Sequence, residues 1–345
     1  MKRANLSIEG LRVVLFLCIF LFHAWGQMFP LGWAGINTFL VITAYFFTIK
    51  LLKTPQTDIS VKEMLWKRAT RLYPVYLTVL IAMSALYVIG RHQLPADFFS
   101  YFLFAQNFHW EFIPKTTEVP GCGHFWYLTL DLYLAMIWLL VFKFVSRKKL
   151  KFTFVALLVF SVIYRSLCAY YADSITLSYT MPTGMMDAFA AGGMLAFMTV
   201  EESKTKLPWI ALILGLIGLI FCVYTTSERF DTGLLGALIP YRKASGYADS
   251  PLTVQIHLVM VLLSFFVVWI CVCNRRHYGI LSNDYLSKWG GVTYELFIFH
   301  FPILWLLRYI IHNHIVIIVV GLLTTITITM IWKHFIEPKV LVAFS

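Results

Sequence analysis

The chain has 345 residues, of which 60% are hydrophobic and only 13% are charged. A soluble domain of this length cannot bury so much apolar surface, so the composition excludes a soluble enzyme and predicts an all-α, polytopic integral membrane protein. The formal net charge of +11 would suggest nucleic-acid binding in a soluble protein. Here the placement of the basic residues explains the charge without a nucleic-acid partner.

About ten hydrophobic segments approach the ~20 residues that a helix needs to cross a bilayer. With the N-terminus in the cytoplasm, most of the 28 Lys and Arg residues lie at inner ends, and both termini are cytoplasmic. We therefore expect a multi-pass protein of the cytoplasmic (inner) membrane, in contact with membrane lipid. Residues 1–345 are expected to form a single membrane domain with no appended soluble domain. The expected spans are 8–29, 34–52, 72–90, 126–145, 152–171, 184–200, 208–225, 252–273, 291–311 and 315–335.

The connections differ in character. The main inner loop, 53–71, is basic, whereas the longest outer connection, 91–125, mixes an apolar stretch with Pro and Gly. That composition predicts a helix lying on the surface and an irregular loop. A second outer loop is expected over 226–251. The six cysteines show neither metal-ligand nor disulfide spacing, so we expect no metal.

The first expected helix carries Arg12 near its start and His23 past its middle. Eleven residues place the two side chains about 16 Å apart along the axis and about 20° apart around it. Ionisable groups are costly in lipid, about 2.5–3.5 kcal/mol for an arginine at a helix centre, and they persist where they line a path enclosed by protein. Arg12 alone could snorkel to the surface and His23 alone could bond another helix, but their shared face favours a function.

A pair of arginines precedes the third expected span. Arg68 and Arg71 are three residues apart and therefore share one helical face. Two guanidinium groups offer planar, bidentate donors that suit a phosphate. Ordinary basicity of an inner loop explains the same residues, so the pair is a moderate signal for a phosphate site.

Two carboxylates lie inside expected spans, Asp131 in the fourth and Asp187 in the sixth. Buried carboxylates in membranes usually have a partner. Either aspartate could pair with a histidine or with an arginine such as Arg165, and the sequence does not choose. His124 and Trp126 begin the fourth span, where an interfacial aromatic belt is the simpler explanation for the tryptophan.

The ninth expected span contains Tyr294 and His300. His300 lies about 13 Å from the inner end of that helix. A structural hydrogen bond is the simpler role for it, although it could approach His23 within the membrane. Glu337 and Pro338 follow the tenth span and are interpreted as a helix stop.

Six short motifs occur along the chain in order. They are Glu9-Gly10-Leu11-Arg12 with His23, Gly35 to Tyr45 with Thr43-Ala44, Arg68-x-x-Arg71-x-x-Pro74, His124-Phe125-Trp126-Tyr127-Leu128, Thr293-Tyr294 through His300-x-Pro302, and Glu337-Pro338. In this order they resemble the membrane-bound acyltransferase type 3 family, integral-membrane O-acyltransferases that modify cell-envelope sugars. Asp131 stands where the family usually has a glutamate, and methionines precede Asp187 where an arginine is common.

The resemblance implies a ten-helix fold. It also implies that the protein takes acyl-CoA (acetyl-CoA) from the cytoplasm as a substrate and has no tightly bound cofactor. The acceptor would be a hydroxyl of an envelope polysaccharide or a lipid-linked glycan at the outer face. His23 would be catalytic as general base or through an acyl-histidine, and Asp131 or His300 would orient its ring. The expected donor- and substrate-binding residues are Glu9, Arg12, Arg68, Arg71, His124, Trp126, Asp187 and Tyr294.

Two other functions fit part of the pattern. A transporter or a flippase of a lipid-linked sugar would also line a path with ionisable residues, but the two halves of the sequence show no repeat. A structural scaffold would leave Arg12, His23 and the arginine pair unexplained.

Overall fold

A computed structural model describes residues 2–112, 119–171, 175–230, 253–273 and 280–344. The described chain is helical, which confirms the predicted all-α class. Most of the expected outer loop 226–251 lies outside the described residues. The helices are α1 (Lys2–Trp25), α2 (Gly35–Lys53), α3 (Val61–Arg91), α4 (Phe98–Phe102), α5 (Gln106–Phe112), α6 (Trp126–Phe144), α7 (Leu150–Tyr171), α8 (Ile175–Tyr179), α9 (Met186–Val200), α10 (Leu207–Phe230), α12 (Ile256–Cys273), α13 (Asp284–Gly290), α14 (Thr293–Leu307), α15 (His314–Ile331) and α16 (Glu337–Phe344).

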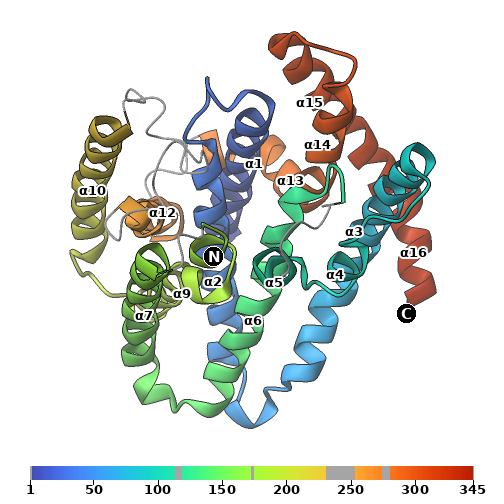
Figure 1. The fold of residues 1–345 in the computed structure, drawn as a ribbon. Coiled ribbons are helices and arrows are strands. Elements are labelled where there is room, and N and C mark those ends of the chain that lie inside the picture. Colours follow the sequence, from blue (N-terminus) through green and yellow to red (C-terminus); the bar gives the residue numbers. More distant parts are fainter. Residues whose placement is uncertain (1, 113–118, 172–174, 231–252, 274–279, 345) are drawn as a thin grey trace.

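The protein is a polytopic membrane protein. In the described part of the chain, eight helices are long and apolar enough to cross a membrane, or nine if the bent pair α13 and α14 counts as one span. α12 is apolar but shorter. All ten expected segments therefore contain a helix, although only eight or nine meet the length for a span. In Figure 1, α1, α2 and α9 lie centrally, α10 lies at one side, and α3, α15 and α16 lie at the other.

The inner loop before α3 is shorter than predicted, because α3 begins at Val61 rather than near residue 72. Ser60 caps the helix: its side-chain oxygen accepts a hydrogen bond from the Glu63 N–H at 3.4 Å. A serine cap followed three residues later by a glutamate is a strong helix start. Arg68 and Arg71 consequently lie on α3 itself, within its first three turns.

The ninth expected span is broken. α13 and α14 meet at an angle of 66° across the Gly290–Gly291 junction. Gly290 packs against α1 so closely that a Cβ there would lie 2.5 Å from the backbone oxygen of Glu9. This contact brings the start of α14 beside the start of α1, and it leaves the first N–H groups of α14 without a partner inside their own helix.

The predicted helix stop at Glu337-Pro338 is wrong, because the chain continues from α15 through a π-helical turn, Trp332–Ile336, into α16. A proline has no N–H and its ring crowds the carbonyl four residues before it. The wider π turn accommodates Pro338 without ending the helix. Lys333 of this turn contacts Glu295 of α14 at 3.1 Å and Glu337 at 2.7 Å, and it joins the last helices to α14.

Candidate active site

A cavity of about 460 Å³ lies between α2, α3, α6 and the start of α14, with one residue of α1 in its wall. Its volume is in the range of small-molecule sites. Along α2 the wall runs from Phe39 to Lys50, which is about 16 Å at 1.5 Å per residue. The cavity is therefore elongated along the helix axes.

The two ends of this cavity differ in charge. Lys50, near the end of α2, and Lys67, near the start of α3, lie toward one end, and Arg12, Arg68 and Arg71 also line the cavity. Phe39 and Tyr127, in the first two turns of α2 and α6, lie toward the other end of the cavity. A ligand with an anionic head and a neutral tail matches this arrangement.

Arg68 forms an ion pair across the cavity wall with Asp131. Its Nε lies 3.2 Å from Asp131 Oδ2, and its Nη2 donates to the same oxygen. The Arg68 side chain is 25% exposed. Asp131 Oδ1 has no hydrogen-bond partner among the described residues. The sequence left the partner of Asp131 open between a histidine and an arginine. In the structure the partner is Arg68, which we predicted to bind the donor.

Arg12, Glu9 and Tyr294, which were also predicted to bind the donor, lie at or beside the cavity. Arg12 lines it and pairs with Glu9 one turn earlier, with 3.1 Å between Arg12 Nη1 and Glu9 Oε1. Tyr294 lines it too, and its hydroxyl donates to the backbone oxygen of Leu72 at 2.8 Å, which ties α14 to α3.

His23 and His300 meet, as the sequence allowed. His23 Nδ1 lies 2.9 Å from His300 Nε2, and the two rings stack with centroids 5.1 Å apart. His300 is fully buried, and its Nδ1 lies 2.7 Å from the backbone oxygen of Phe297. The arrangement links α1 to α14 through two imidazoles.

This chain of hydrogen bonds fixes the tautomers of two neutral imidazoles. A carbonyl only accepts, so His300 Nδ1 carries the hydrogen that it donates to the oxygen of Phe297. His300 Nε2 then has a lone pair, and His23 must donate to it from Nδ1. The lone pair of His23 is thereby left on Nε2, where it can accept a proton from a substrate.

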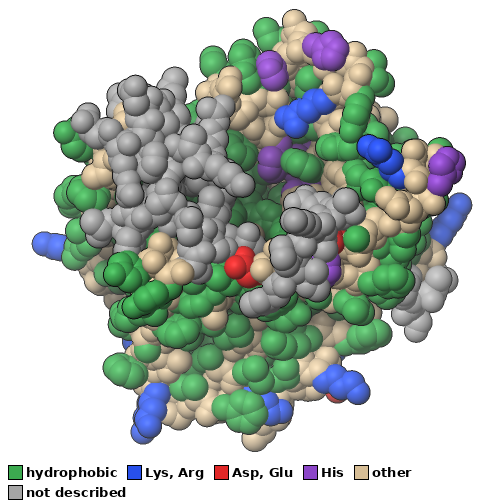
Figure 2. Space-filling view, viewed as in Figure 1, with side chains coloured by type: hydrophobic (Ala, Val, Ile, Leu, Met, Phe, Trp, Pro, Cys, Tyr) green, Lys and Arg blue, Asp and Glu red, His purple; other side chains and the backbone are tan. Residues whose placement is uncertain are grey.

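His124 stands next to this pair. Its ring lies 5.2 Å from that of His300, and its Nε2 bonds the backbone oxygen of Ile298 at 3.2 Å. The Nδ1 atom of His124 is buried and has no hydrogen-bond partner in the described chain. Figure 2 shows a hollow in one face of the molecule, with histidine side chains at its edge and hydrophobic side chains within.

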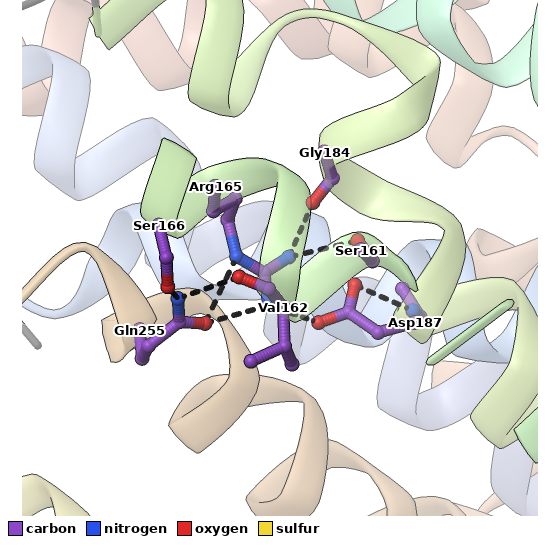
Figure 3. A network of polar contacts seen from close by, with 8 residues as sticks. Ser161, Val162, Arg165, Ser166, Gly184, Asp187 and Gln255 are labelled. Carbon is purple, nitrogen blue, oxygen red and sulfur yellow. Dashed lines mark hydrogen bonds and ion pairs between the residues drawn. The ribbon is translucent and has the colours of Figure 1, made fainter. Parts of the chain in front are cut away.

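Two predicted site residues lie elsewhere. Asp187, fully buried, pairs with Arg165, with 2.6 Å between Oδ2 and Nη2. Figure 3 shows Arg165 at the centre of a polar network that also includes Gln255. Trp126 packs on Tyr179 with ring centroids 4.4 Å apart. Neither Asp187 nor Trp126 lines the cavity, so a direct role for them in donor binding stays a prediction.

The sequence analysis missed several residues at the site. Phe297 lines the cavity and also contacts the His300 ring, with centroids 5.4 Å apart; its position one turn before His300 was the available signal. Arg308 follows α14 and donates from Nη2 to the backbone oxygen of His23. Partial burial lowers the pKa of Arg308 from its usual value. This contact fastens the outer end of α14 to α1 beside the histidine pair.

A family model described as an acyltransferase domain matches residues 5–333. Comparisons with curated proteins and with solved structures found no match. The matched range includes the lining of the cavity, His23 and His300, and it covers nearly the whole chain. The chain therefore belongs to the acyltransferase type 3 family, and it is a membrane acyltransferase.

Proposed function

We propose that this protein is an acyl-CoA-dependent O-acyltransferase of the cytoplasmic membrane. It would transfer a short acyl group, acetyl above all, to a hydroxyl of an envelope polysaccharide or a lipid-linked glycan. One observation carries the proposal: five cationic side chains line the elongated cavity, and Phe297 of the same lining adjoins the histidine pair.

The donor would bind with its phosphates at the basic end. Lys50 and Lys67 lie toward that end, and Arg68 and Arg71 line the cavity farther along α3. Coenzyme A carries a diphosphate and a phosphate monoester, which suit this group of cations. Its flexible pantetheine arm would extend along α2, and its thioester would lie toward Phe297.

His23 would act as general base at the other end. The acceptor hydroxyl attacks the thioester carbonyl while His23 Nε2 takes its proton. The tetrahedral intermediate then breaks its C–S bond, and the departing sulfur receives that proton to leave as the thiol of coenzyme A. General-base catalysis contributes about 10²–10⁴-fold. His300 would hold the reactive tautomer, the role that the third residue plays in a catalytic triad.

The same geometry permits a covalent route. His23 Nε2 would attack the thioester carbonyl, and the C–S bond would break to release coenzyme A as the thiolate. The acceptor hydroxyl would then attack the acyl carbon and break its bond to Nε2, and the hydroxyl proton would pass to the thiolate. Both routes require the lone pair on His23 Nε2, so in both routes His300 must accept the hydrogen bond from His23 Nδ1 that fixes this tautomer.

The test separates donor binding from transfer. Replacing His23 with alanine should abolish acylation of envelope glycans, measured by mass spectrometry in cells that lack the native gene, while calorimetry still detects acetyl-CoA binding. His334→Ala, at an exposed histidine far along the chain in the π turn, is the matched control. Full acylation by the His23→Ala protein at normal membrane abundance would refute the proposal. A transporter or flippase would bind no acetyl-CoA.

A further inference from the structure

One side chain, Phe297, stands between the donor cavity and the histidines. It lines the cavity, and its ring centroid lies 5.4 Å from that of His300 and 5.3 Å from that of His124. On the cavity side it meets Tyr127 at 5.3 Å. Phe297 is only 5% exposed. A thioester that extends from the cavity to His23 must therefore pass this ring.

Aromatic rings also fill the space around the histidine pair. Phe16 and Phe20 of α1 lie 5.8 and 6.4 Å from the ring of His300. Phe301 lies 4.9 Å from the ring of His23. Both Phe16 and Phe20 are buried, at 2% and 0% exposure. Close-packed walls of this kind respond to a volume change of a single methylene.

We propose that Phe297 limits the size of the acyl group and restricts the donor to acetyl or another very short acyl chain. This inference rests on the proposed function, and it adds the residue that sets the acyl length. The thioester carbonyl must come close to His23 Nε2, so the acyl carbons beyond it lie among these rings. Each extra methylene would have to displace a ring that is already in contact with its neighbours.

The backbone and the side chain of Phe297 act separately. Its carbonyl oxygen holds His300 Nδ1, and a substitution that keeps α14 intact keeps that oxygen. Removing the ring therefore enlarges the acyl site without removing the hydrogen bond that orients the histidines. A change in acyl preference can then be assigned to volume.

The same helix supplies a matched control. Phe299 is also a buried phenylalanine of α14, at 8% exposure, but its ring faces Trp332, with centroids 6.1 Å apart. Phe299 does not line the cavity. Phe299→Ala removes the same atoms from the same helix at a distance from the acyl site, and it reports the effect of lost packing alone.

The experiment compares the affinities of purified wild-type, Phe297→Ala and Phe299→Ala proteins for acetyl-CoA, butyryl-CoA and hexanoyl-CoA by calorimetry. The wild type should prefer acetyl-CoA to butyryl-CoA, which is two methylenes longer, by at least the roughly 10–200-fold that one methylene usually contributes in an apolar pocket. Phe297→Ala should remove most of that preference, and Phe299→Ala should keep it. The probes need no acceptor, so the unknown glycan does not enter the measurement.

The outcomes separate the two levels of the proposal. An unchanged preference in Phe297→Ala would overturn the role of Phe297 and leave the acyltransferase assignment standing. If the wild type binds none of the three thioesters, the proposed function fails and the size limit fails with it. If the alanine variant does not fold, Phe297→Leu should shift the preference in the same direction by a smaller factor, and no shift in that variant overturns the inference.

Discussion

Two arginine–aspartate pairs in this protein have the same chemistry and different surroundings. Arg165 and Asp187 are both 0% exposed, and Arg165 also donates to Ser161, to the backbone oxygen of Gly184 and to Gln255. Asp187 uses its second oxygen on the N–H of Ala188. Every charged group of this pair thus has partners, as Figure 3 shows for the arginine.

The pair of Arg68 and Asp131 is less complete. Arg68 contacts only one oxygen of Asp131 and faces the cavity, and Asp131 Oδ1 has no hydrogen-bond partner in the described chain. A saturated pair fastens helices together, whereas an unsaturated one keeps donors available for a ligand. The comparison indicates that Arg165 serves the fold, and it fits the proposal that Arg68 binds the donor.

The largest effect is expected from breaking the saturated pair. Arg165→Met leaves the charge of Asp187 buried without a partner, and this should destabilise the protein by about 3–5 kcal/mol. Thermal unfolding in detergent and membrane abundance measure the loss. Adding Asp187→Leu should recover part of it, because an apolar pair of similar volume carries no buried charge. A wild-type melting temperature in Arg165→Met would contradict the structural role.

The next effect concerns the unsaturated pair. Arg68→Gln should weaken acetyl-CoA binding by about 10–100-fold, since a hydrogen bond to a charged group contributes about 1.5–3 kcal/mol. Calorimetry measures it, and the melting temperature should fall less than in Arg165→Met, because the Arg68 side chain is 25% exposed. Lys148→Gln, at an exposed inner cation outside the cavity, is the control. Equal losses in both variants would indicate general screening rather than a site.

Salt should distinguish the two pairs further. Raising the ionic strength from about 0.05 M to about 0.5 M shortens the screening length well below the size of the cavity, so acetyl-CoA binding should weaken several-fold. The difference in melting temperature between wild type and Arg165→Met should stay the same, because a fully buried pair is screened little. Salt-independent binding of acetyl-CoA would argue against a phosphate site.

The smallest effect is expected from Asp131→Asn. The amide oxygen still accepts from Arg68, and Arg68 reaches the cavity, so the free energy of unfolding should change by less than about 1 kcal/mol. Thermal unfolding beside Asp187→Asn provides the comparison. If Asp131→Asn lowered the free energy of unfolding as much as Asp187→Asn, the two ion pairs would contribute equally to stability.

Hydrophobic length located the helices, because about 20 apolar residues signal a span whatever their contacts. It failed where polar residues continue a helix beyond the membrane, as in the first turns of α3. The helix stop predicted at Pro338 also failed, because a π turn accommodates the proline and the helix continues. In both places local hydrogen bonding decides the outcome, and hydropathy carries no information about it.

Pairing across the fold was the part that the sequence could not supply. His23 and His300 are 277 residues apart, and chemistry alone allowed Asp131 to bond a histidine as readily as an arginine. Phe297 was overlooked because a phenylalanine in an apolar helix usually belongs to the core. Its position between the cavity and the imidazoles depends on the tilt of α14, which follows from the break at Gly290–Gly291.

The hydrogen-bonded series from His23 through His300 ends on a peptide carbonyl, where many hydrolytic enzymes place a carboxylate. With both imidazoles neutral, neither ring carries a charge until a proton arrives. Such a centre needs no permanent counter-ion in a hydrocarbon setting. It also offers no standing negative charge to repel an anionic donor or a departing thiolate.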